Sequence, residues 1–104
     1  MSTTHTKIRT AIAKVLRSGQ PFTILTEKTG IGDTEVLRVI TPAWSRLGKV
    51  ERVSRIQDAV LPMLNPAERK RIFRFSVLTD REWNSVRTAR AGGKTKVVGR
   101  RRVA

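Results

Sequence analysis

The sequence predicts an α+β domain that is mainly α-helical, with three N-terminal helices, a β-hairpin, a C-terminal helix and a basic tail. Three observations predict this fold class. Apolar residues recur at helical spacing over 6–17 and 33–47, residues that favour strands fill 50–56 and 71–78, and basic residues without acids end the chain. A length of 104 residues fits one domain with a tail, and 38% apolar residues can build a modest core.

The first helix is expected over 6–17, after a flexible N-terminus at 1–5. Its apolar residues follow the spacing of a helix with one buried face: Ile8, Ala11, Ile12, Val15 and Leu16. Gly19 at a left-handed cap position and Pro21 beyond it favour the end of this helix.

A short second helix is expected over 24–29. Thr23 can cap its N-terminus, and Gly30 can close it in the left-handed region of backbone conformation. Ile31 is a lone apolar residue in a glycine-rich turn, so we expect it to be buried as a plug.

The third helix is expected over 33–47 and has two distinct faces. Its apolar stripe recurs at i, i+3, i+7 and i+10: Leu37, Ile40, Trp44 and Leu47. The opposite face holds one arginine among hydroxyl side chains: Thr34, Arg38, Thr41 and Ser45. Arginine can bind a guanine edge through two hydrogen bonds, and Ser or Thr can reach bases or phosphates. This face is a candidate DNA-binding surface; the alternative is an amphipathic core helix whose outer face has no function.

Pro42 lies within this expected helix and removes one of its backbone hydrogen bonds. A kinked helix, or one broken in two, is therefore an open alternative.

Two strands joined by a long loop are expected next. Residues 50–56 and 71–78 favour strands, and the second segment is the stronger candidate. The connecting segment 57–70 is too long for a tight hairpin loop. Within it, Asn65 as a cap, the proline after it and Glu68 at the third position predict a turn or one short helix.

A fourth helix is expected over roughly 80–91, because Thr79 and Glu82 form a capping-box pattern. Its apolar stripe is thin, so we expect it to dock on the domain through Trp83 or to pair with a second subunit. The residues 94–104 are basic and rich in small side chains, which predicts a segment that is disordered until bound.

The strongest bulk property is a net charge of +14, from 22 Lys and Arg against 8 Asp and Glu. A charge of that size indicates a polyanionic partner, most often nucleic acid. A membrane surface is the weaker candidate, because no basic segment carries a large exposed apolar face. After Glu82 no acid follows, and seven basic residues do: Arg87, Arg90, Lys94, Lys96, Arg100, Arg101 and Arg102.

The absence of cysteine excludes disulfides, cysteine-ligated zinc and a thiol nucleophile, and it fits a reducing cytoplasm. No apolar run approaches the length of a transmembrane helix, and residues 1–10 lack the apolar core of a signal peptide. The sequence therefore favours a cytoplasmic, nucleoid-associated protein.

Little in the sequence supports catalysis. The single histidine, His5, lies in the expected flexible terminus, and the acids are scattered without a pair placed for acid/base work or metal binding. Gly30 and Gly32 do not match a nucleotide-binding fingerprint. We therefore expect no enzyme activity, no cofactor and no metal.

The order of the expected elements resembles the winged helix-turn-helix family of DNA-binding domains. The residues that carry the resemblance are Phe22-Thr23, Gly30-Ile31, the apolar stripe of 33–47, and Leu47-Gly48-Lys49-Val50-Glu51-Arg52. The resemblance implies a winged helix domain over 6–78, a C-terminal helix at 79–91 and a basic disordered tail at 92–104. Pro42 in the third helix and the long segment 57–70 depart from the pattern of the family.

By this resemblance, the third helix enters the major groove and the wing reaches phosphates or the adjacent minor groove. The recognition-helix contacts fall on Thr34, Glu35, Arg38, Thr41, Ser45 and Arg46. The wing contacts fall on Arg55, Arg69, Lys70 and Arg71. The tail is expected to add non-specific affinity through Lys94, Lys96, Arg100, Arg101 and Arg102. Two clusters have a plainer alternative, since 69–71 can keep a sheet edge soluble and 100–102 can be a solubilising tail.

The function expected from these features is sequence-specific binding of double-stranded DNA by a small transcriptional regulator, a repressor. A homodimer through the first or the C-terminal helix would place operator half-sites about one helical turn apart. On this hypothesis Arg38→Ala costs about 1–3 kcal/mol on the cognate site. Two alternatives stay open: phage or plasmid DNA handling, such as packaging or origin binding, and structural RNA or ribosome binding, with RNA the less favoured partner.

Overall fold

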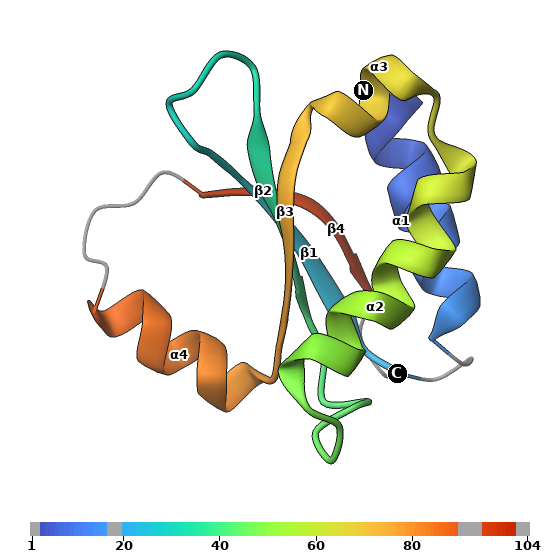
Figure 1. Cartoon of the computed structure of the whole chain (residues 1–104). Helices are drawn as coiled ribbons and strands as arrows, with labels where there is room; N and C mark the ends of the chain where they lie inside the picture. Colours follow the sequence, from blue (N-terminus) through green and yellow to red (C-terminus); the bar gives the residue numbers. More distant parts are fainter. Residues whose placement is uncertain (1–2, 17–19, 90–94, 102–104) are drawn as a thin grey trace.

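The computed structural model describes residues 3–16, 20–89 and 95–101 (Figure 1). In chain order, its helices and strands are α1 (Thr3–Val15), β1 (Phe22–Lys28), β2 (Glu35–Ile40), α2 (Lys49–Val60), the 3-10 helix η1 (Leu61–Met63), α3 (Pro66–Lys70), β3 (Ile72–Leu78), α4 (Asp80–Ala89) and β4 (Thr95–Arg101).

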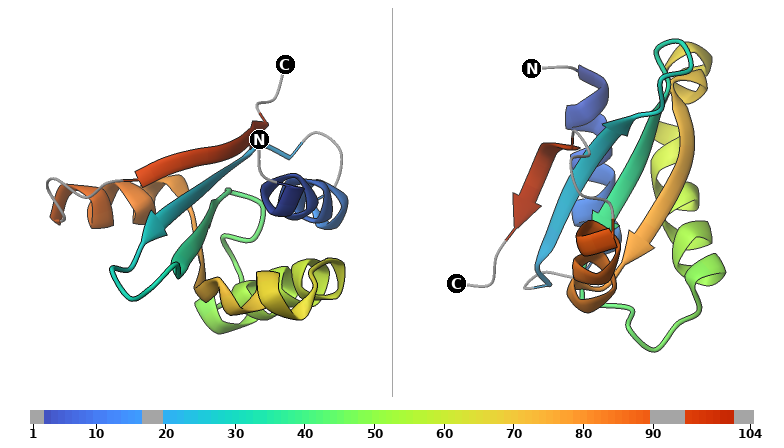
Figure 2. Two further views of the ribbon diagram at one scale, coloured as in Figure 1. Left: turned by 90° about the horizontal axis from the view of Figure 1, so that it is seen from above. Right: turned by 90° about the vertical axis from the view of Figure 1, so that its left-hand side faces the viewer.

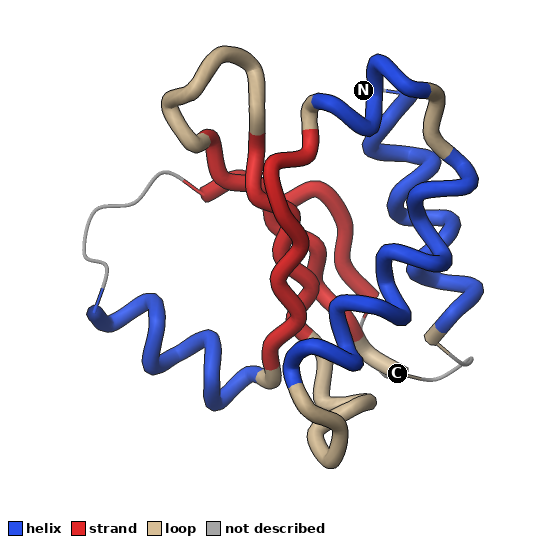
Figure 3. Tube along the Cα trace, in the orientation of Figure 1, coloured by secondary structure: helices blue, strands red, loops and turns tan. Residues whose placement is uncertain are grey.

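The strands form one four-stranded sheet in the order β3-β2-β1-β4. β1 and β2 are an antiparallel hairpin, β4 is antiparallel to β1, and β3 is parallel to β2 after a crossover through α2, η1 and α3. Helices α1 and α2 cover one face of the sheet and α4 lies on the other, as the two views of Figure 2 show. Figure 3 shows the twisted strands as the central layer between these helices.

The main core lies between the sheet and the pair α1 and α2. It is built from apolar side chains that are nearly or fully buried: Ile8, Ala11, Ile12 and Leu16 from the first helix and its end, Phe22, Ile24, Leu37, Val39 and Val77 from the strands, and Ile56, Val60 and Leu64 from α2 and the segment after it. Each such aliphatic or aromatic side chain contributes about 1.5–3 kcal/mol through removal from water, so this layer holds the fold together.

A smaller apolar cluster lies under α4 on the other face of the sheet. Leu25, Ile40 and Leu78 are buried there, and Trp83 and Val86 of α4 pack against them. The prediction that the fourth helix docks on the domain through Trp83 is therefore confirmed.

The predicted winged helix-turn-helix fold is wrong, because a single helix, and not three, precedes the first two strands. The segment 24–29, expected to be a helix, lies mostly in β1. The segment 33–47, expected to be the recognition helix, forms β2 followed by a loop at 41–48. The β1-β2 hairpin takes the place of the helix-turn-helix unit.

The physical reason is that β2 is buried on both faces. Leu37 and Val39 point into the main core, whereas Ile40 points into the cluster under α4. A strand covered on both faces needs a nearly continuous apolar run, which contains Leu37 and Ile40 at i and i+3 by chance, and Trp44 at i+7 lies in the loop that follows. The β-branched residues of both strands then favour the extended conformation, and Pro42 lies in the loop that follows β2 and not inside a helix.

The segment 50–56, expected to be the first strand of a wing, is instead part of α2. Val53, Ile56 and Val60 have the spacing of one helical face, and this face packs on the sheet. The crossover needed between two parallel strands explains why a helix forms here.

Several local predictions are confirmed. The first helix appears as α1, the stronger strand candidate as β3 and the fourth helix as α4. Asn65 and Glu68 form a capping box at the start of α3, with the Asn65 side chain accepting from the Glu68 N–H at 2.8 Å. These elements depend on side chains a few residues apart, which is why their local patterns predicted them correctly.

Two further expectations are corrected. Ile31 is not a buried plug, since 63% of its side chain is exposed in the β1-β2 loop; Gly30 has the expected positive φ (85°), but in this loop and not at a helix end. The tail expected to be disordered contains β4, which pairs with β1. Of the expected flexible N-terminus, Thr3 to His5 belong to α1.

Candidate nucleic-acid interface

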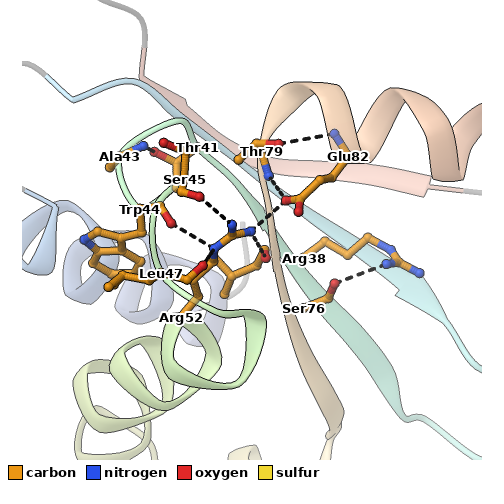
Figure 4. Close-up of polar contacts among 11 residues, drawn as sticks. Arg38, Thr41, Ala43, Trp44, Ser45, Leu47, Arg52, Ser76, Thr79 and Glu82 are labelled. Atoms are coloured by element: carbon orange, nitrogen blue, oxygen red, sulfur yellow. Dashed lines mark hydrogen bonds and ion pairs between the residues drawn. The ribbon is translucent and has the colours of Figure 1, made fainter.

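Arg52 of α2 is buried, and its guanidinium donates hydrogen bonds to α4, to β3 and to the loop 41–48 (Figure 4). Its guanidinium donates to Glu82 Oε1 of α4 at 2.6 Å and to the carbonyl of Val77 in β3 at 3.4 Å. It also donates to three carbonyls of the loop 41–48: Trp44 (2.9 Å), Leu47 (2.9 Å) and Ser45 (3.2 Å). The five donors of a guanidinium suit this role, because one side chain can satisfy several otherwise unpaired carbonyls.

Glu82, the carboxylate partner of Arg52, lies in the first turn of α4. Its Oε1 accepts the Thr79 backbone N–H at 2.8 Å, and the Thr79 hydroxyl accepts the Glu82 N–H at 3.2 Å, so the predicted capping box is present. The Thr79 N–H, together with the Arg52 guanidinium, lowers the pKa of the Glu82 carboxyl. The carboxylate therefore stays charged as the partner of Arg52.

Arg38 was expected at the centre of the DNA-reading face, but it is buried in the sheet, with 4% of its surface exposed. Its Nε lies 3.4 Å from Glu27 Oε2 and its Nη1 lies 3.4 Å from Ser76 Oγ. Its guanidinium lies over the Trp83 ring, 5.4 Å from the ring centroid. Burial, followed by the nearby charge of Arg74, lowers the pKa of Arg38. A guanidinium in this position packs against Trp83 of α4 and does not lie on the exposed face of a helix, where it was expected.

The other five residues of the expected recognition helix do not form one face. Thr34 lies in the β1-β2 loop, where its hydroxyl is 2.6 Å from that of Thr29, and Glu35 begins β2. Thr41 is buried and donates to the Pro21 carbonyl at 2.8 Å. Ser45 and Arg46 are exposed in the loop 41–48.

The expected wing residues lie on helices and at their ends. Arg55 is on α2, 3.5 Å from Glu51 and over the Trp44 ring. Arg69 and Lys70 end α3, and Arg71 follows directly; all three are exposed. Arg69 Nε also donates to two backbone carbonyls in the preceding segment, Leu61 (3.0 Å) and Leu64 (3.1 Å).

Of the expected tail residues, Lys96, Arg100 and Arg101 belong to β4. Lys94 and Arg102 lie outside the described residues. Among the described residues, the expected recognition and wing contacts are thus distributed over β2, the loops beside it, α2 and the end of α3.

A groove along β3 gathers basic and aromatic side chains that come from four elements. We call it the β3 groove and define it by Lys28, Arg38, Lys49, Phe73, Arg74 and Phe75. Its volume is about 690 Å³, and it extends to the apolar side chains under α4, such as Leu78 and Val86. The four basic residues share it with one acid, Glu27, which is the partner of Arg38. The groove therefore carries a formal excess of three positive charges.

The groove lies at an open edge of the sheet. Within residues 3–16, 20–89 and 95–101, no strand pairs with β3 on the side away from β2. The phosphate contacts predicted at Arg69, Lys70 and Arg71 do not line this groove, and Lys28, Lys49, Phe73 and Arg74, which do, were not among the predicted contacts. Adjacent aromatic and basic residues at 73–75 were the available signal, whereas the approach of Lys28 and Lys49 depends on tertiary structure.

Comparison with protein-family models, with curated proteins and with solved structures finds no match to this chain. Within the described part of the chain, no helix is long and apolar enough to cross a membrane. Among these same residues, no three or more His, Cys, Asp or Glu side chains are grouped as they would be to hold a metal ion.

Proposed function

We propose that this protein binds nucleic acid, and that the exposed basic side chains of the β3 groove contact the phosphates. The observation that carries the proposal is the charge of that groove, in which Lys28, Lys49 and Arg74 are exposed and the single acid, Glu27, already faces Arg38. Phosphate contacts by Lys and Arg supply most of the affinity in non-specific nucleic-acid binding.

The distribution of the acids supports the same proposal. Four of the eight carboxylates form ion pairs within the protein: Glu27, Glu51, Glu68 and Glu82. With 22 basic residues, the chain keeps a net charge of +14, which attracts a polyanion at long range. A polyanion would release counterions on binding, so its affinity should depend strongly on salt.

The mode of binding that we propose is phosphate contact without reading of a base sequence. Base reading was expected from Arg38 and Thr41 on one helix, but both are buried and belong to β2 and the loop after it. Ser45 and Arg46 of the same expected set are exposed in the loop 41–48 but do not line the groove, so the mode of binding that we propose does not depend on them. DNA handling and structural RNA binding both remain compatible with phosphate contact.

The test is the affinity of the full chain for labelled single-stranded and duplex oligonucleotides, measured by fluorescence anisotropy over a range of salt. Three phosphate contacts predict a slope of log K against log salt of about −2 for a single strand, or about a 16-fold loss of affinity between roughly 50 and 200 mM salt. The proposal would be overturned if the protein bound neither oligonucleotide at low salt, or if its affinity did not change with the salt concentration.

Two charge reversals with the same change in net charge locate the site. Lys49→Glu removes a groove contact and should reduce the magnitude of the slope for a single strand by about 0.7. Lys14→Glu, on the exposed face of α1, lies outside the groove and should leave the slope close to that of the unmodified protein. Equal effects of both variants would place the contact surface elsewhere.

A further inference from the structure

We propose that Phe73 is a base-stacking residue, and that the β3 groove therefore takes a single strand of nucleic acid. This inference rests on the proposed function and adds the class of nucleic acid to it. The first observation behind it is the pairing of β3 with β2 at the N-terminal end of β3.

The pairing between β2 and β3 shifts by one residue at Phe73, as it does at a β-bulge. Glu35 of β2 lies opposite Ile72, and the next residue, Val36, lies opposite Arg74. Phe73 is thus the extra residue between two paired positions, without a partner on β2. Ile72 packs against the main core, whereas 57% of Phe73 is exposed.

Among the five aromatic residues of the chain, Phe73 is the exposed one. The other four aromatic residues, Phe22, Trp44, Phe75 and Trp83, are buried or half-buried. Burying a phenylalanine side chain contributes about 1.5–3 kcal/mol, so leaving Phe73 in water forgoes a large part of that stabilisation. Bulges at sheet edges often aim a side chain at a binding site. The exposed Phe73 ring is therefore a candidate contact for a ligand.

Three exposed basic residues line the same groove as this ring. Arg74 follows it in the chain and is exposed, and Lys28 and Lys49 line the same groove from β1 and α2. An exposed aromatic ring in an open groove that also holds basic side chains suits a single strand, because a base can stack on the ring while the phosphates meet the cations. In a duplex the same faces are covered by neighbouring base pairs and become accessible only after unstacking.

The same charges argue against a second copy of the chain at this edge. Two grooves with three excess positive charges each, on molecules of net charge +14, repel one another. A strand of nucleic acid has the complementary charge, so we assign the groove to it.

The decisive experiment separates bases from phosphates. The affinities of the full chain are measured for an oligothymidine strand, an oligouridine strand, and a strand of equal length made of abasic sites. Phe73→Leu keeps an apolar side chain but removes the aromatic face, and it should weaken binding to the base-containing strands by about 5- to 100-fold. Its affinity for the abasic strand should equal that of the unmodified protein.

Two control variants accompany it. Phe73→Tyr retains the ring and should bind within about twofold of the unmodified protein, because stacking is preserved. Met63→Ala removes an exposed apolar side chain in η1, outside the groove, and should have no effect on any strand. Far-UV circular dichroism of each variant establishes that its fold is retained.

Each other outcome has a definite meaning. If the unmodified protein binds no strand even at low salt, both the proposed function and this inference fail. If it binds with the expected salt dependence but Phe73→Leu changes nothing, or weakens the abasic strand equally, only the stacking inference fails. A change of oligomeric state in Phe73→Leu, seen by sedimentation, would identify a protein interface and also overturn stacking. A preference for the thymidine or the uridine strand indicates whether DNA or RNA is bound, and only the comparison with the abasic strand tests stacking.

Discussion

At the residue scale, two arginines that look alike in the sequence as exposed cations have structural roles. Arg52 donates to the carbonyls of the loop 41–48 and to Glu82, and Arg38 lies between the sheet and Trp83. Both are almost fully buried, and each forms an ion pair with a carboxylate. The Trp83 ring for Arg38 and the backbone carbonyls for Arg52 further compensate for the lost contact with water. Buried guanidinium groups need such partners, because an unpaired buried charge is strongly destabilising.

Arg52→Ala should lower the free energy of unfolding by about 2–4 kcal/mol, because it leaves several buried carbonyls without a donor. Arg52→Lys keeps the charge opposite Glu82 but lacks the forked geometry, so its stability should be intermediate. Urea unfolding followed by circular dichroism measures both values. An Arg52→Lys variant as stable as the unmodified protein would show that the fork does not matter and that only the ion pair does.

At the element scale, one carboxylate joins the first helix to the crossover. Glu68 of α3 accepts from the Thr4 hydroxyl at 2.6 Å and from Lys7 Nζ at 2.9 Å, both in α1, and from the Asn65 backbone N–H at 2.9 Å. The Thr4 hydroxyl, then the Asn65 N–H and Lys7, lower the pKa of Glu68 from 4.5 to about 2. The three donors thus favour the ionised carboxylate in the folded protein.

This lowered pKa predicts an acid-dependent loss of stability. The contribution of Glu68 is complete above a pH of about 4.5, where the unfolded chain is also ionised, and it disappears as the pH falls towards about 2. The urea midpoint measured at several pH values should fall less steeply in this window for Glu68→Gln than for the unmodified protein. Glu82 leaves some pH dependence in the variant, because its pKa is also lowered.

Asp58→Asn, which removes an exposed carboxylate on α2, is the matched control for this change of charge. It should reproduce the pH profile of the unmodified protein. A Glu68→Gln profile that coincides with that of Asp58→Asn would contradict the link between α1 and α3.

At the scale of the whole molecule, the ends of the chain complete the fold. β4, close to the C-terminus, pairs with β1 and makes it a central strand, while α1 covers the sheet from the opposite end of the sequence. Gly99 of β4 lies close to Arg9 of α1, since a Cβ atom at this position would be 3.1 Å from Arg9 Cδ. The basic C-terminal segment therefore has a structural partner as well as charge.

Deletion of residues 95–104 should lower the urea midpoint and speed hydrogen exchange at those β1 amides that face β4, because β1 would become an open edge. Deletion of 102–104 alone removes an arginine but no residue of β4 and is the control. Identical midpoints and identical exchange in the two truncated chains would show that β4 adds no stability.

The sequence by itself determined the features that depend on neighbouring residues or on bulk composition. The capping boxes at Asn65 and Thr79 marked the starts of α3 and α4, the spacing of apolar residues marked α1, and the residues at 71–78 marked β3. The net charge of +14 likewise needs no structure and already pointed to a polyanion.

Only the tertiary structure decided the conformation of 22–28 and 35–40, the burial of Arg38, and the β3 groove. An apolar run such as that of β2 is compatible with a helix or with a strand buried on both faces, and the choice depends on partners far along the chain. The position of Phe73 between two paired residues is likewise a property of the register between β2 and β3. These features arise from contacts between distant segments, which local spacing does not contain, and for that reason the candidate site could be located only once the strands were paired.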